Sequence, residues 1–235
     1  MAGWALKRFW TEARVEERDG GFSVTLDGRE VKTPGKRALV VPTRGLAEAI
    51  AAEWRAQDRE VRPETMPFTR SANSALDKVA TQFDEVTGLL AAYGETDLIC
   101  YRAVAPAALV ARQKAGWDPL LDWASDLLAA PLHTTQGVVP QAQPADSLSR
   151  LSERVRGLSA FQIAAFHDLV AISGSLVLAF AVAEGRLSAE EAWTLSRIDE
   201  TWQASQWGED EEAAAAEALR KAAFLHAARF FALCG

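Results

Sequence analysis

The chain has 235 residues, of which 49% are apolar and 24% are charged, and its formal net charge is −7. This composition excludes a largely disordered chain, because so apolar a sequence can offset the entropy lost on folding. Its two cysteines lie far apart and in no paired motif, which excludes a disulfide framework and a cysteine zinc site. The apolar segment 169–183 is shorter than the roughly 20 residues of a membrane span, so we expect a buried helix and no membrane insertion.

The charge is unevenly distributed along the chain. Residues 1–70 contain thirteen Lys or Arg and eleven Asp or Glu, whereas residues 71–235 contain twelve and twenty-one. Nucleic acids and anionic membranes attract basic surfaces, so we expect neither as a partner. A basic or mixed-charge protein surface is the better match, although an acidic surface can also simply keep a protein in solution.

The first forty residues have the pattern of β-structure. Phe22, Val24 and Leu26 alternate with polar residues, as in a strand with one buried face. Turn signals rich in Asp and Gly come before and after this segment and suit short hairpin connections. Thr43 can cap a following helix in which apolar residues recur every four positions. We therefore predict a small antiparallel sheet and a helix that packs Trp54 against it.

Helical periodicity dominates the rest of the chain. Pro119 predicts a kink or a division within one of these helices, and Ser188 begins a capping box that marks the start of another. The order of elements predicts an α+β fold, with a small β-rich N-terminal domain over residues 1–94 and an all-helical orthogonal bundle over residues 95–235. The expected helices lie near 70–80, 82–93, 106–130, 145–156, 160–184, 188–206 and 210–233.

The sequence contains no motif for catalysis or for a cofactor. The glycine patterns of phosphate loops and dinucleotide-binding turns are absent from it, and its three histidines are too scattered for a metal site. His167 and Asp168, with Ser173 or Ser175, lack the pattern that surrounds a hydrolase serine. We therefore expect no catalytic residue, no cofactor and no metal.

Acids and tryptophans near the end of the chain form the clearest candidate site. Residues 199–217 contain seven acids and no base. A continuous helix over 188–206 would place Trp193 and Glu200 on one side, together with Trp207 if the helix extends that far. Aromatic side chains around a charge are typical of protein-binding hot spots. The alternative is a central helix that buries both faces and pairs Glu200 internally.

Several short motifs occur in an order that resembles a known family, the ATP synthase assembly chaperones that bind the alpha subunit of the F(1) catalytic head (ATP12-type chaperones). The resemblance extends over nearly the whole chain. The motifs are Arg8-Phe9-Trp10, the segment from Leu26 to Pro34, Val41-Pro42-Thr43, Glu53-Trp54, the segment from Thr96 to Arg102, the segment from Trp117 to Leu121, Gly174-Ser175-Leu176, and Asp199-Glu200 with Gln203 and Trp207-Gly208.

The resemblance implies a molecular chaperone rather than an enzyme. Such a protein binds the free alpha subunit and prevents its aggregation until the beta subunit displaces it. Glu200 belongs to the acidic Asp-Glu-x-x-Gln element of the family and is the first choice for contact with the client. Eukaryotic relatives are mitochondrial, whereas we expect this chain to be a cytoplasmic monomer of a bacterium. The expected client-binding residues are Glu200, Trp207, Trp202, Trp193, Gln203 and Asp199.

Two other classes of protein remain open at the level of sequence. One is a small acidic helical-domain enzyme that uses Glu200 and Asp199 as acid and base. The other is a self-associating scaffold protein whose tryptophan-rich face joins copies of the chain. A bound small molecule would favour the first class, and a dimer that buries Trp193 and Trp207 would favour the second.

Overall fold

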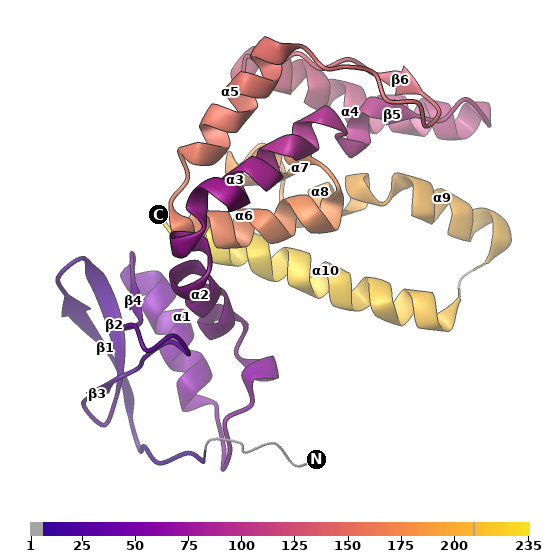
Figure 1. Cartoon of the computed structure of the whole chain (residues 1–235). Coiled ribbons are helices and arrows are strands. Elements are labelled where there is room, and N and C mark those ends of the chain that lie inside the picture. The colour runs from indigo at the N-terminus through magenta and orange to yellow at the C-terminus, as the bar shows by residue number, and fades with distance from the viewer. Residues whose placement is uncertain (1–6, 209) are drawn as a thin grey trace. The chain divides into compact units, whose positions relative to one another are not determined.

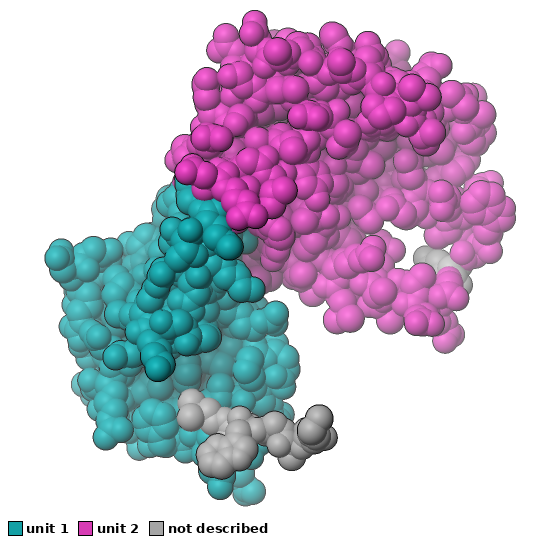
Figure 2. Space-filling view, viewed as in Figure 1, with its two compact units in different colours: residues 1–83, 159–165, 229–235 teal, residues 84–158, 166–228 magenta. Residues whose placement is uncertain are grey.

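The computed structural model describes residues 7–208 and 210–235 (Figure 1). The chain divides into two compact units (Figure 2). Unit 1 contains the chain up to residue 83 together with residues 159–165 and 229–235, and unit 2 contains residues 84–158 and 166–228. The domain boundary at residue 94 stays a prediction. Chain order alone did not indicate that unit 1 would include the C-terminal end, because that depends on contacts between residues far apart in the sequence.

Unit 1 is built on a small antiparallel sheet, as predicted. Strands β1 (Ala13–Arg18) and β2 (Gly21–Leu26) form a hairpin, and Gly20 in its turn has a φ of +83°. Strands β3 (Arg29–Glu30) and β4 (Val40–Val41) pair with the two ends of β2. Val24 and Leu26 belong to the buried cluster of unit 1 and Phe22 packs against it, as predicted, but Ser23 and Thr25 on the opposite face are buried as well.

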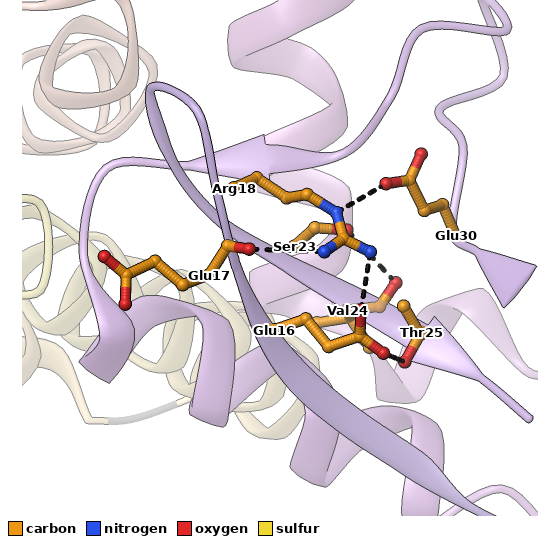
Figure 3. A network of polar contacts seen from close by, with 7 residues as sticks. All are labelled: Glu16, Glu17, Arg18, Ser23, Val24, Thr25 and Glu30. Atoms are coloured by element: carbon orange, nitrogen blue, oxygen red, sulfur yellow. Dashed lines mark hydrogen bonds and ion pairs between the residues drawn. The ribbon is translucent and has the colours of Figure 1, made fainter. Parts of the chain in front are cut away.

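The opposite face of β2 is covered by an ionic network (Figure 3). Arg18 Nε donates to Glu30 Oε1 at 2.8 Å, and Arg18 Nη2 contacts Glu16 Oε2 at 2.5 Å. Thr25 Oγ1 donates to the other Glu16 oxygen at 2.9 Å. These hydrogen bonds, first that from Thr25 and then that from Arg18, hold the pKa of Glu16 below its usual value. Thr25 is therefore buried beneath charged side chains of neighbouring strands.

Two helices complete the core of unit 1. In α1 (Arg44–Arg55), Thr43 Oγ1 accepts a hydrogen bond from Leu46 N at 3.2 Å, which confirms the predicted cap. Trp54 is buried, and α1 packs against β1 and β2. Helix α2 (Pro67–Asp77) is capped by Glu53 of α1, whose carboxylate accepts the N–H groups of residues 68 and 69. Short 3-10 helices, η1 (Pro63–Thr65) and η2 (Val79–Thr81), flank α2.

Beyond residue 82 the described chain is helical, apart from one parallel pair of two-residue strands, so the α+β class is confirmed. Within residues 7–208 and 210–235, no helix is both long and apolar enough to cross a lipid bilayer. The elements are α3 (Phe83–Ala91), η3 (Ala92–Glu95), η4 (Leu98–Cys100), β5 (Tyr101–Arg102), α4 (Ala107–Leu127), β6 (Thr135–Gln136), α5 (Ala145–Arg156), α6 (Ala160–Ser173), α7 (Leu176–Ala183), α8 (Ala189–Ser196), α9 (Ile198–Trp207) and α10 (Glu211–Ala232).

Two predicted helices are each divided in the structure. Gly174 has a φ of +72° and ends α6, and Ser175 then caps α7 by accepting a hydrogen bond from Leu178 N. The predicted 188–206 helix is interrupted at Arg197, which lies between α8 and α9 with a φ of −112° and a ψ of 19°. By contrast, the 106–130 segment contains a single helix, α4, with Pro119 inside it.

Asp97 is fully buried at the start of α7. Its carboxylate accepts hydrogen bonds from Val177 N at 3.0 Å and from Ile99 N at 3.2 Å. The Asp97 carboxylate therefore binds N–H groups that have no partner within their own helices. Arg102 pairs with Asp118, with 2.7 Å between Arg102 Nη1 and Asp118 Oδ1.

Candidate functional site

The six predicted client-binding residues lie on α8 and α9 of unit 2, but they do not form one surface. Trp193 is only 5% exposed; its ring packs against Phe224 at 5.9 Å between centroids, and the Arg197 guanidinium lies 5.3 Å from its centre. The prediction that Trp193 shares one helix face with Glu200 is wrong, because the helix is interrupted at Arg197. Trp193 is therefore part of the core and not of an exposed surface.

Glu200 is both paired and accessible. Its Oε1 lies 2.8 Å from Arg197 Nη1 within the first turn of α9. The Arg197 side chain is 13% exposed, whereas that of Glu200 is 52% exposed. The internal partner foreseen in the alternative interpretation is therefore present, but the carboxylate still faces solvent. A half-exposed ion pair of this kind contributes little to folding, typically about 0–1 kcal/mol.

Asp199 anchors the base of α9 to α4. Its Oδ1 accepts a hydrogen bond of 2.6 Å from Nε2 of Gln113, a side chain that is 1% exposed. Close by, Gly116 of α4 lets α9 approach, because a Cβ at that position would lie 3.0 Å from Ile198 Cδ1. Sequence reasoning missed Gln113, since a single glutamine in an amphipathic helix gives no signal of its partner.

Beyond this base the chain forms an exposed arm. Figure 1 shows α9 leading away from α8 and α10 returning from its end. We define the α9–α10 arm as residues 199–208 and 210–223. Within it Gln203 is exposed, Trp202 is partly buried and Trp207 is 81% exposed. Every residue from Asp210 to Ala223 is exposed.

The arm is also strongly acidic. Residues 199–217 contain seven acids and no Lys or Arg, and six of these acids lie in the arm as defined. The seventh, Glu209, lies outside the described residues. Asp210 caps α10, because its Oδ1 accepts a hydrogen bond from Ala213 N at 2.8 Å. An exposed acidic segment of this kind can attract a basic surface, and it contains two indoles for apolar contact.

Among the described residues, neither a metal-binding group nor a hydrolase triad around Ser173 is assembled. No group of three or more His, Cys, Asp or Glu in residues 7–208 and 210–235 is placed to hold a metal ion. His167 Nδ1 lies 3.0 Å from Asp168 Oδ1, and that hydrogen bond raises the pKa of His167. Ser173, however, is fully buried and donates to the Leu169 carbonyl at 2.6 Å. Its hydroxyl therefore serves the end of α6 rather than a hydrolase triad.

Comparison with known proteins identifies the class. A model of the ATP12 chaperone protein family matches residues 7–125. The mitochondrial protein atp12 of Schizosaccharomyces pombe is 27% identical over 221 residues, which cover 89% of this chain and 76% of that protein. The crystal structure of Atp12 from Paracoccus denitrificans is 50% identical, covers 97% of this chain and 98% of that one, and superposes with a TM-score of 0.95. The Atu1473 protein of Agrobacterium tumefaciens is 40% identical, with a TM-score of 0.90, covering 96% and 84%.

These likenesses define a molecular chaperone of ATP synthase assembly. The chain belongs to the ATP12 chaperone family, which confirms the resemblance seen in its motifs. The family match ends at residue 125, whereas α8, α9 and α10 lie beyond it.

Proposed function

We propose that this chain binds the free alpha subunit of the ATP synthase catalytic head and prevents its aggregation until the beta subunit displaces it. The role is that of a binding protein and not of an enzyme. Membership of the ATP12 chaperone family supports the general role. The α9–α10 arm is the observation that supports a contact with a client protein.

The arm gains little from packing within its own unit. Helix α10 is exposed over its first thirteen residues, 211–223, and Leu219 within this stretch is 75% exposed. Surface helices normally bury one apolar face against a core. Trp207 is likewise 81% exposed at the end of α9, and tryptophan is enriched in the energetic centres of protein interfaces. A partner that covers these side chains explains why they are placed in solvent.

The charge of the arm indicates the chemistry of its client. Residues 199–217 carry only negative charge, so a client surface with Arg or Lys is complementary. Glu200 already pairs with Arg197 at the edge of solvent. An arginine of the client can bind Glu200 beside Arg197 or in its place, and the cost is small because exposed ion pairs are weak. Release then follows when beta offers alpha a larger interface, and no nucleotide hydrolysis is required.

The test uses purified alpha subunit, the full chain and two single variants, Trp207→Ser and Glu200→Gln. Aggregation of alpha on dilution from denaturant is followed by light scattering. Glutamine can still accept the hydrogen bond from Arg197, so Glu200→Gln removes charge with little effect on α9. Asp122→Asn is the matched control, because Asp122 is exposed on α4 nine residues after Gln113 and faces the opposite side of that helix.

We expect the unmodified chain to suppress the scattering and the control to act like it. Trp207→Ser should bind alpha at least about tenfold more weakly, the effect of losing an interface hot spot. Thermal unfolding of each variant should stay near that of the unmodified chain. Equal aggregation of alpha with and without the unmodified chain would contradict the proposal.

A further inference from the structure

A second exposed apolar feature of unit 2 lies on the loops around the β5–β6 pair. We define the valine tip as Val104, Val138 and Val139, which are 71%, 89% and 71% exposed. Val104 follows β5, and the other two follow β6. The two strands are parallel, and Gly137 N donates to the Arg102 carbonyl at 2.9 Å. The strand pairing therefore brings the two loops together.

The loops of the valine tip are free of charged residues. Residues 128–144 contain no Asp, Glu, Lys or Arg over seventeen positions, and neither do residues 103–106 over four. In a chain that is 24% charged, exposed loops of this length are expected to carry several charges. Exposed apolar side chains without charges around them mark surfaces that meet another protein.

The loop after β6 has a fixed shape. His133 N donates to Gln143 Oε1 at 2.7 Å, and Gln143 Nε2 donates to the His133 carbonyl at 2.9 Å. Within this closed loop, Thr135 Oγ1 donates to the Val139 carbonyl at 3.1 Å. Valines held in a preorganised loop can be covered by a partner with little loss of conformational entropy.

One buried side chain joins the valine tip to the arm. Gln113 Oε1 accepts a hydrogen bond of 2.8 Å from Ala103 N, directly before Val104, and Gln113 Nε2 donates to Asp199 at the base of α9. Arg102 of β5 is also fixed on α4, through its ion pair with Asp118 at 2.7 Å. The tip and the base of the arm are therefore held on the same helix.

We propose that the valine tip is a second contact for the client that the α9–α10 arm binds. This inference rests on the proposed function and extends it. The arm attracts basic groups of alpha, and the valine tip covers an uncharged apolar part of the same subunit. A second copy of this chain is a poorer occupant, because two chains that each carry a net charge of −7 repel each other.

The test is a double variant, Val138→Ser with Val139→Ser, in the full chain. Its dissociation constant for purified alpha subunit is measured by titration, beside its thermal unfolding. Leu89→Ser is the matched control, because Leu89 is 65% exposed on α3 of the same unit. We expect the double variant to bind alpha roughly tenfold or more weakly, with unchanged unfolding, and the control to bind like the unmodified chain.

The outcomes separate this proposal from the proposed function. If the double variant binds alpha like the unmodified chain while Trp207→Ser remains weak, the valine tip is not a client contact and the proposed function stands. If Leu89→Ser weakens binding equally, the effect does not belong to the tip and the inference is overturned. The inference is also overturned if light scattering shows that the unmodified chain is a dimer and the double variant is a monomer, while both bind alpha equally well. If the unmodified chain does not bind alpha, the proposed function and the valine tip contact fail together.

Discussion

The buried carboxylate of Asp97 makes the stability of this protein depend on pH in an unusual direction. Burial, its largest influence, raises the pKa of Asp97 from 3.8 to about 6, although hydrogen bonds from Ser175 and from backbone N–H groups oppose the rise. The folded chain therefore binds more protons than the unfolded chain between these two values. The ionisation of Asp97 therefore lowers the free energy of unfolding as the pH rises from 3.8 to about 6, and its effect is constant at higher pH.

The size of the effect follows from the two pKa values. One pKa unit corresponds to about 1.4 kcal/mol, so a rise from 3.8 to about 6 corresponds to roughly 3 kcal/mol. Asp97→Asn removes the titration and keeps the size of the side chain. The amide nitrogen of the variant cannot accept the N–H of Val177 or of Ile99, so a constant loss is also expected. The free energy of unfolding of the variant minus that of the unmodified chain should increase by roughly 2 kcal/mol between pH 4 and pH 6.5, because part of the full change lies outside this window.

The assay is urea unfolding of both proteins at closely spaced pH values. The difference between the two cancels the titration of carboxylates that the proteins share. Glu191→Gln is a control of opposite sign, because hydrogen bonds from Ser188 hold the pKa of Glu191 below its usual value. Its stability relative to the unmodified chain should therefore fall as the pH rises. If the two curves for Asp97→Asn and the unmodified chain run parallel from pH 4 to pH 6.5, the reasoning is refuted.

Three further predictions concern packing, capping and thiol chemistry. Gly116→Ala should lower the free energy of unfolding by about 1–3 kcal/mol, because the added Cβ would lie 2.9 Å from Leu195 Cδ2. Gly88→Ala should raise the free energy of unfolding by up to about 1 kcal/mol, because a Cβ at that position has no atom within 4 Å and alanine favours the helix. Urea unfolding of both variants measures this contrast. Ser188→Ala removes the hydroxyl that accepts the N–H of Glu191 in the capping box before α8 and should cost about 1 kcal/mol in the same assay. Burial raises the pKa of the Cys100 thiol to about 12, so a thiol reagent at pH 8 should modify it only as the chain unfolds, and rapid modification of the folded chain would contradict this.

Local features of the sequence were sufficient to predict much of the fold. The alternation in β2 and the glycine of its hairpin turn depend on neighbours only a few residues away. The caps at Thr43 and Ser188 depend on the next three residues. Elements of this kind are predictable because their causes, side-chain periodicity and helix capping, operate within one or two turns of the chain.

The sequence indicates a candidate site but not the surface that it forms. The acids and tryptophans between positions 193 and 207 mark α8 and α9 as the candidate. Their arrangement, however, depends on the interruption at Arg197, which places Trp193 in the core and leaves Trp207 in solvent. Helical periodicity does not reveal this interruption, which accompanies the packing of Arg197 on the ring of Trp193.

Sequence alone therefore determined the family, the α+β class and most of the elements, because motifs, turns and caps are local. Tertiary structure alone decided which of the marked side chains are available to a partner. Gln113 illustrates the reason: it joins Ala103 to Asp199, a residue eighty-six positions away from it. Such a bridge depends on how whole helices pack, and no local pattern around position 113 records it.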